Sequence, residues 1–317
     1  MLPAFLSSIN STFTLIRSML PTITDIEEVS CYVTARRLWT SVYGENMLPA
    51  DPMFQREWDE IHCKKVLDNM VFENDQDRAS FLASTQKESN AWLQALPSRS
   101  VGTLLDNNTF RISLALRLGS PLCTPHTCVC GERVSADGTH GLSCVKSAGR
   151  ASRHSQLNDT ICRALVSARV PSVLEPVGLQ QEDGRRPDGM SLVPWKDGKC
   201  VVWDATCGDT VAPSHVEGSA RQAGRVAEVR AIQKKNKYRH IGEDHLFVPF
   251  SVETLGPWCE EVKRFVEEVG RQLIECTRER RAAAFLIERI SLAIQRGNAA
   301  AAVMGTVAGT SKRDELF

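Results

Sequence analysis

A short apolar run, Cys200–Val201–Val202–Trp203, leads directly into the carboxylate of Asp204. β-Branched and aromatic residues favour an extended strand, and the side chains of a strand alternate between its two faces. The pattern therefore predicts a half-buried strand over 200–206, with Asp204 on the same face as Val202 and Thr206. An ionised carboxylate in such a strand is costly unless a cation or hydrogen bonds compensate it.

A second carboxylate, Asp188, precedes that strand in the segment Arg186–Pro187–Asp188–Gly189. Because Pro187 fixes the backbone before it, we expect Asp188 to begin or bend the preceding strand. Glu175, next to Pro176 in an earlier predicted strand, offers a third carboxylate. Strand ends that bring these groups together would present oxygen ligands suited to Mg²⁺, an ion widely used in phosphodiester chemistry.

A predicted helix over 217–238 offers a cation to this site. Small residues form a packing stripe on it, and Lys234 interrupts the stripe, which consists of Ala220, Gly224, Ala227, Ala231, Lys234 and Tyr238. A lysine on a packed stripe indicates a carboxylate partner, and Lys237 lies three residues away on an adjoining face. The alternative is that Lys234, Lys235 and Lys237 form a solvated basic helix end, which the helix dipole favours.

Cysteine and histidine residues crowd into one loop, with the spacing Cys128-x-Cys130-x9-His140-x3-Cys144. Three thiolates and one imidazole make a tetrahedral set that suits structural Zn²⁺, and a four-ligand site leaves no open position for catalysis. We therefore expect a structural or nucleic-acid-docking role for this loop. Cys123 and His126 are alternative ligands.

Composition excludes little. Lys plus Arg equals Asp plus Glu, 38 each, so the net charge does not predict a partner. The first twenty residues contain Asn10 and Arg17 and lack a basic leader, so we expect neither a signal peptide nor a membrane span and place the protein inside the cell. The chain contains no Gly-x-Ser-x-Gly turn, no phosphate-binding Gly-x4-Gly-Lys-Ser/Thr loop and no paired Asp-Asp of a polymerase.

Periodicity predicts an α/β fold with an all-helical N-terminal part. Apolar residues recur at helical spacing over 26–39 and 91–118, and again over 153–168. Strands are expected at 173–177, 186–193, 200–206 and 246–252. A last helix should begin near Pro257, and the Ala- and Gly-rich chain after Gly297 is expected to fray.

The motifs together resemble a known family, the C-terminal region of non-LTR retrotransposon proteins. The similarity covers about residues 120–255. It lies in Cys128–Gly131, His140–Cys144, Arg153-His154-x3-Asn158-Asp159, Arg186–Gly189, Val202–Thr206 and Lys234-x2-Lys237-Tyr238. The stretch 92–119 is similar to the helices that join the reverse-transcriptase thumb to a CCHC zinc knuckle in this family.

The resemblance implies a PD-(D/E)XK nuclease-like core, a mixed sheet flanked by helices. It divides the chain into a thumb-like helical segment (1–120), a zinc knuckle (121–150), a restriction-like endonuclease core (151–255) and a C-terminal helix with a flexible tail (256–317). It further implies nuclear nicking of target DNA, with the element's RNA as another partner, to leave a 3′ hydroxyl that primes reverse transcription.

Carried over by position, Asp188 and Asp204 would hold catalytic Mg²⁺, and Lys234 or Lys237 would be the catalytic lysine. Thr206 stands where the superfamily's commonest form has its lysine, so a lysine from the helix would have to replace it. The polymerase core is missing, so we expect a fragment or a remnant of a longer protein.

Two further hypotheses stay open. In the first, the protein is a non-catalytic nucleic-acid-binding module in which the knuckle and four arginines grip phosphates: Arg150, Arg153, Arg185 and Arg186. His154 would cap its helix or contact phosphate as readily as take part in catalysis. In the second, the chain is an inactive retrotransposon remnant.

Overall fold

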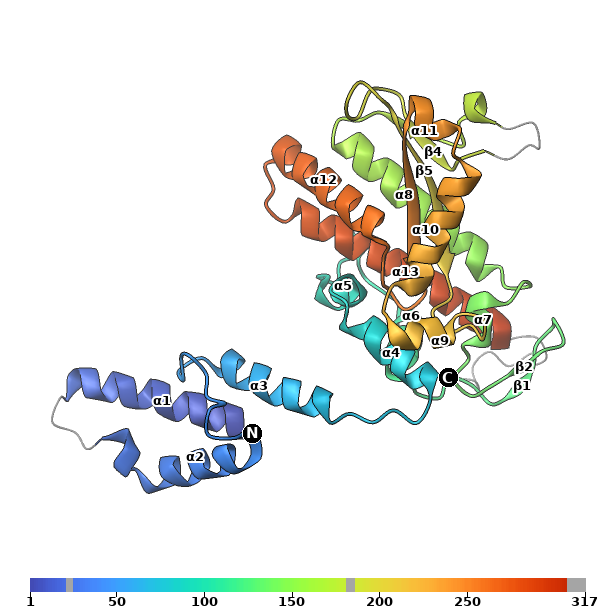
Figure 1. Ribbon diagram of the computed structural model, residues 1–317. Helices are drawn as coiled ribbons and strands as arrows, with labels where there is room; N and C mark the ends of the chain where they lie inside the picture. The colour runs from blue at the N-terminus through green and yellow to red at the C-terminus, as the bar shows by residue number, and fades with distance from the viewer. Residues whose placement is uncertain (21–24, 181–185, 307–317) are drawn as a thin grey trace. The chain divides into compact units, whose positions relative to one another are not determined.

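The computed structural model describes residues 1–20, 25–180 and 186–306, and the chain divides into two compact units, Met1–Phe72 and Glu73–Phe317 (Figure 1). The first unit is helical, with α1 (Leu2–Met19), α2 (Ser30–Tyr43), α3 (Gln55–Asp68) and a 3-10 turn at Ile26–Glu28. Its core centres on Trp39 and Trp58, whose rings meet edge-on with centroids 4.7 Å apart. Each indole N–H donates to a backbone carbonyl, so both rings are buried without an unpaired donor.

The second unit holds the predicted site and is mixed α/β. Its helices, in the part of the chain that the structure describes, are α4 (Asp75–Thr85), α5 (Ala91–Gln94), α6 (Asn107–Leu118), α7 (His140–Ser143), α8 (Gly149–Ser167), α9 (Val216–Arg221), α10 (Arg225–Lys237), α11 (Ile241–Asp244), α12 (Glu260–Thr277) and α13 (Ala282–Thr306). Short 3-10 turns lie at Glu88–Asn90 and Val177–Leu179. A two-stranded ribbon, β1 (His126–Thr127) with β2 (Arg133–Val134), precedes α7.

The main sheet is small and mixed, with the order β3–β4–β5–β6. β3 (Ser172–Leu174), β4 (Gly189–Ser191) and β5 (Val201–Gly208) are antiparallel neighbours, whereas β6 (Leu246–Glu253) runs parallel to β5. A parallel pair needs a crossover connection, which α9, α10 and α11 supply. All four predicted strands are present, but β3 and β4 are only three residues long. β3 ends at Leu174, so Glu175 lies just after the strand that was predicted to contain it, in a left-handed conformation (φ 51°).

Helices cover both faces of this sheet, with α10 against β5 and β6, and α8 against β3 and β5 (Figure 1). Trp203 donates its indole N–H to Asn158 on α8 at 3.0 Å, whereas the next residue, Asp204, accepts from Tyr238 on α10. The predicted alternation along β5 is therefore confirmed. The main core lies mostly between the sheet and α8, α12 and α13, and includes Leu157, Leu165, Phe250, Val262 and Ile290.

Three helix predictions were wrong in detail. The helix expected over 217–238 is two helices, because Gly224 takes a left-handed conformation (φ 79°) before α10. The last helix is likewise interrupted, at Arg278 (φ 61°), to give α12 and α13. The chain after Gly297 continues α13 to Thr306, because Ala299, Ala301 and Ala302 are buried there, while 307–317 lie outside the described residues.

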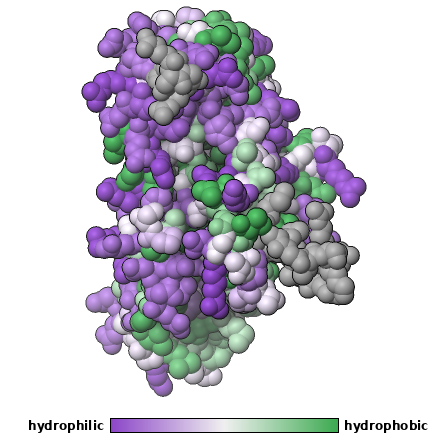
Figure 2. All heavy atoms as spheres, turned by 90° about the vertical axis from the view of Figure 1, so that its right-hand side faces the viewer, coloured by the Kyte–Doolittle hydropathy of each residue, from purple (hydrophilic) through white to green (hydrophobic). Residues whose placement is uncertain are grey.

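The face turned to the viewer in Figure 2 is mostly hydrophilic, with its hydrophobic residues gathered in separate areas. Within the described ranges, every helix is too short or too polar to cross a membrane.

Candidate active site

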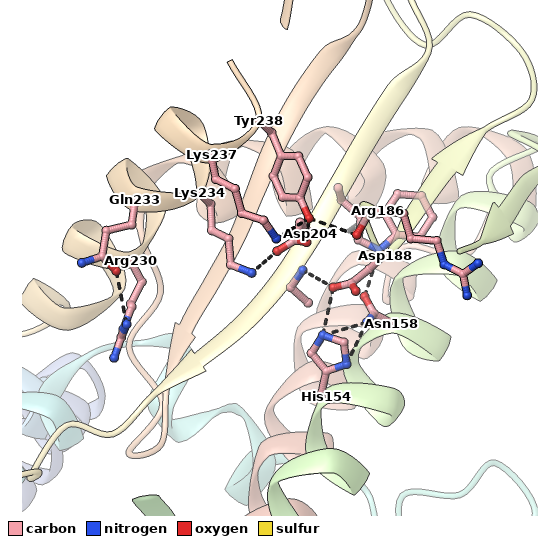
Figure 3. Close-up of polar contacts among 12 residues, drawn as sticks. His154, Asn158, Arg186, Asp188, Asp204, Arg230, Gln233, Lys234, Lys237 and Tyr238 are labelled. Carbon is pink, nitrogen blue, oxygen red and sulfur yellow. Dashed lines mark hydrogen bonds and ion pairs between the residues drawn. The ribbon is translucent and has the colours of Figure 1, made fainter. Parts of the chain in front are cut away.

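Asp188 and Asp204 are neighbours on adjacent strands. Gly189 pairs with Trp203 in the antiparallel β4–β5 ladder. Asp188, the residue before Gly189, therefore lies opposite Asp204, the residue after Trp203. The backbone N–H of Asp188 donates to the Trp203 carbonyl (3.0 Å), and the N–H of Ala205 donates to Asp188 Oδ2 (2.6 Å). Since Asp188 binds the residues on both sides of Asp204, the two carboxylates are held side by side (Figure 3).

Asp204 receives its partners from α10. Its side chain is only 4% exposed, and the Lys234 ammonium forms an ion pair with its Oδ2. That oxygen is shielded from solvent and accepts no further hydrogen bond from the residues that the structure describes. The Tyr238 hydroxyl, one helical turn after Lys234, donates to Oδ1 at 2.9 Å. The carboxylate partner predicted for Lys234 is confirmed, and the alternative of a fully solvated lysine is wrong for this residue.

Asp188 receives a cation from the opposite side. His154 on α8 places Nε2 2.9 Å from Asp188 Oδ2, while half of the imidazole stays exposed. This hydrogen bond raises the pKa of His154, against the lowering effect of burial. Burial, the largest influence, would raise the pKa of Asp188, but the hydrogen bond and charge of His154 together with the hydrogen bonds from Ala205 and Asn158 outweigh it and lower that pKa. The pair therefore favours a charged aspartate beside an imidazolium.

The remaining predicted catalytic residues lie further out. Lys237 is exposed, with its ammonium 2.7 Å from the Tyr238 hydroxyl. Lys234 pairs with the Asp204 carboxylate directly, whereas Lys237 contacts the Tyr238 hydroxyl that donates to it. The exposed side chain of Glu175 forms an ion pair with Arg186. The backbone N–H of Glu175 donates to the Asp188 carbonyl at 2.8 Å. The Arg186 carbonyl accepts from Tyr238, while its guanidinium points away from the aspartates (Figure 3).

Arg153 is not where a nucleic-acid contact requires it. Its side chain is buried, with the residue 2% exposed, and the guanidinium donates to Asn298 of α13 and to the Leu142 carbonyl of α7. A phosphate cannot reach a group enclosed in this way, so the predicted contact was wrong for Arg153. Arg150, one turn earlier, is exposed. Arg185 lies outside the described residues.

The four predicted zinc ligands come together. The ligand atoms of Cys128, Cys130, His140 and Cys144 all lie within 4.8 Å of one another. Cys128 Sγ is 3.8 Å from Cys144 Sγ, and Cys130 Sγ is 3.2 Å from His140 Nε2. The turn at Cys128–Gly131 and the short helix α7 bring the two halves together, and this group can bind a metal such as zinc.

The alternative ligands are engaged elsewhere. Cys123 Sγ points to the carbonyls of Ser135 and Ala136, and His126 Nδ1 lies 2.9 Å from the Thr124 carbonyl. Neither belongs to the group within 4.8 Å. The predicted set of four is therefore the one that the fold assembles.

Sequence reasoning gave no role to three residues that shape this site. Tyr238 was recognised as part of a stripe and of the family motif but was given no contact, although its position four residues after Lys234 could have signalled a shared partner. Asn158 accepts from Trp203 and lies against the His154 ring. Glu253 is fully buried at the end of β6 and accepts from the first turn of α10. An acidic residue that ends the apolar strand 248–252 was its only signal.

The arrangement places two adjacent carboxylates between two cationic groups that reach them from different helices. Such a site can bind a cation, or hold an anionic group against Lys234 and His154 once either one moves off its carboxylate. Neither a scan against protein-family models nor a search of curated proteins finds a match to this chain.

Proposed function

We propose that this chain is a metal-dependent DNA endonuclease. The observation that carries the proposal is the pair of Asp188 and Asp204 on adjacent strands, with the Lys234 ammonium brought to it from a helix. The mixed sheet flanked by helices is the arrangement that a PD-(D/E)XK nuclease core requires. Lys234 then stands in for a lysine at Thr206, which was the main departure from the family pattern.

Asp188 and Asp204 would hold Mg²⁺. The donor set fits, because both groups offer carboxylate oxygens at one edge of the site, and Asp204 Oδ2 is buried with an ammonium as its sole partner in the described part of the chain. A bound Mg²⁺ would offset the negative charge that develops on the phosphate during hydrolysis.

The protein's own groups would position the reactants. Lys234 would turn its ammonium towards the attacking water or a non-bridging phosphate oxygen, while Tyr238 keeps Asp204 in place. The water oxygen bonds to phosphorus, and the bond between phosphorus and the 3′ oxygen breaks. A proton from the water is transferred to the 3′ oxygen, which becomes a hydroxyl, and the phosphate stays on the other fragment. The product would be a 3′ hydroxyl on the nicked DNA. In the nucleus this end would prime reverse transcription, with the element's RNA as template.

The Cys/His cluster would hold Zn²⁺ in a structural role, because its four protein ligands fill a tetrahedral shell. Zinc content of the purified chain, compared with a Cys128→Ser variant, tests this assignment.

The decisive experiment is nicking of supercoiled DNA in Mg²⁺ by the wild type and Asp188→Asn. The matched control is Asp159→Asn, an acid on the surface of α8 whose partner is the exposed Arg163. We expect nicking to disappear in Asp188→Asn and to persist in the control. Equal nicking by all three proteins would refute the assignment of the site.

A second candidate function has its own support. His154 and Lys234 already neutralise both carboxylates, as expected of aspartates that only hold the fold together. In that case the chain is a non-catalytic nucleic-acid-binding module, carried by the knuckle and by Arg150 and Arg186. Salt-sensitive DNA binding without cleavage in any divalent ion would favour it. Neither binding nor cleavage is expected of an inactive remnant.

A further inference from the structure

Arg153 is a buried cation with no role in the chemistry above. The residue is 2% exposed, its Nη1 donates to Asn298 Oδ1 at 2.7 Å, and its Nη2 lies 3.4 Å from the Leu142 carbonyl. Its Nε is buried and has no hydrogen-bond partner within the described ranges of the chain. Burial of a guanidinium is unfavourable unless hydrogen bonds and nearby charge compensate it, so a simple core position does not account for it.

One branch of its contacts leads to the Cys/His cluster. Leu142 lies in α7, between the two predicted ligands His140 and Cys144. The same helix packs closely on α13. A Cβ on Gly141 would lie 2.5 Å from the Ala301 carbonyl oxygen, so a side chain at this position cannot be accommodated. The cluster is therefore anchored to the core, and Arg153 is hydrogen-bonded to the backbone of the cluster at Leu142.

The other branch leads to β6. Asn298, the hydrogen-bond acceptor of Arg153, donates its own amide to the Thr254 carbonyl at 2.6 Å. Thr254 follows β6, and its hydroxyl donates to Asp209 Oδ1 and accepts from the Thr210 N–H. Asp209 is buried, and burial raises its pKa; hydrogen bonds from Val211, Ser143 and Thr254 and, as a smaller influence, the charge of Arg153 act in the opposite direction.

This second branch ends at α10. The Thr210 hydroxyl donates to Glu253 Oε2 at 3.0 Å. Glu253 Oε1 accepts the backbone N–H groups of Val226 and Ala227, at 2.9 and 3.1 Å, in the first turn of α10. A buried carboxylate at a helix N-terminus fixes the direction in which that helix enters the fold.

Both helices that hold the aspartates are thus tied to Arg153. It immediately precedes His154 on α8, which binds Asp188, and its second branch ends at the start of the helix that carries Lys234. We propose that Arg153 is a positioning residue that joins the Cys/His cluster to the aspartate site, so that metal occupancy of the cluster sets the rigidity of α8 and α10. This coupling depends on the hydrogen-bond network and does not require that the site cleaves DNA.

Hydrogen exchange of the full chain, loaded with Zn²⁺ or stripped by a chelator, tests the coupling. In the wild type, metal removal should speed exchange about tenfold or more in the first half of α8 and in α10, as expected for the loss of a hydrogen bond to a charged group. In Arg153→Met, exchange there should be fast with and without metal. Arg163→Met is the matched control, because Arg163 lies on the same helix but is exposed, and it should behave as the wild type.

Asn298→Ala separates the two branches and serves if Arg153→Met does not fold. It removes the link to Thr254 but leaves Arg153 on Leu142, so chelation should still speed exchange in α8 and no longer in α10. A chain that binds no Zn²⁺, or a chelator effect confined to 121–150 in the wild type, would overturn the proposal. So would a chelator effect on α10 that persists in both variants.

Discussion

Replacing Glu253 with glutamine should remove a pH-dependent loss of stability from the folded protein. Glu253 has no exposed surface, and burial, the largest influence, raises its pKa from an ordinary 4.5 to about 7. The hydrogen bonds from Ala227, Thr210 and Val226 lower that pKa but do not compensate for burial, and the charge of Asp209 adds to the rise. The folded protein therefore binds this proton more tightly than the unfolded chain does.

The direction of the pH dependence of stability follows from the linkage between proton binding and folding. A carboxyl group with the higher pKa in the folded state gives its full stabilising contribution below pH 4.5, and that contribution disappears as the pH rises through about 7. A pKa difference of about 2.5, at about 1.4 kcal/mol for each pH unit, amounts to about 3 kcal/mol. Glutamine cannot ionise, so Glu253→Gln should lack this dependence. Its carbonyl can accept from Val226 and Ala227, and its amide can donate to Thr210.

The assay is urea unfolding at a series of pH values. Unfolding is monitored by hydrogen exchange in α12, because α12 belongs to the same unit as Glu253. Relative to the variant, the wild type should lose about 3 kcal/mol of unfolding free energy between pH 4.5 and 8. Glu243→Gln, at an exposed acid, is the control and should track the wild type. A constant difference between wild type and Glu253→Gln across this range would refute the reasoning.

Three further outcomes are expected. Lys234→Met should abolish nicking without unfolding the chain. Lys235→Met should nick DNA as the wild type does, because the Lys235 ammonium pairs with Glu261 and not with an aspartate of the site. Cys144→Ser should lower zinc content and melting temperature together, because metal binding contributes to folding free energy. Gly189→Ala should destabilise the protein by about 1–3 kcal/mol or more in thermal unfolding, since a Cβ there would lie 2.0 Å from the Trp203 ring.

The strands could be predicted because their signal is local. Alternation along 200–206 placed Trp203 and Asp204 on opposite faces, and the contacts of both residues agree. The break before α10 could not be predicted in the same way. Gly224 suits a tightly packed helix as well as a left-handed turn, and what stabilises the new helix start is Glu253, distant in the sequence and brought there by the parallel pairing of β5 and β6.

The candidate site was only partly predictable for a related reason. The packing stripe correctly indicated a carboxylate partner for Lys234, but it could not identify Asp204 as that partner or show which of the two lysines forms that ion pair. Those choices depend on how α10 crosses β5, which long-range packing decides. The spacing of the Cys/His ligands, in contrast, lies within seventeen residues, so the correct four could be named from the sequence.

Arg153 and His154 are neighbours on α8 with opposite environments, one buried and the other exposed. Arg153 was assigned to a phosphate contact, and His154 to a helix cap, a phosphate contact or catalysis. Adjacent residues on a helix point about 100° apart, so burial of one leaves room for exposure of the other. Arg153 lies four residues before Leu157 and eight before Ile161, on the apolar stripe of its own helix. A charge on an apolar stripe is the signal that singled out Lys234. Applied to α8, it predicts a buried arginine with buried acceptors, and this is the position from which Arg153 can connect the cluster to the aspartates.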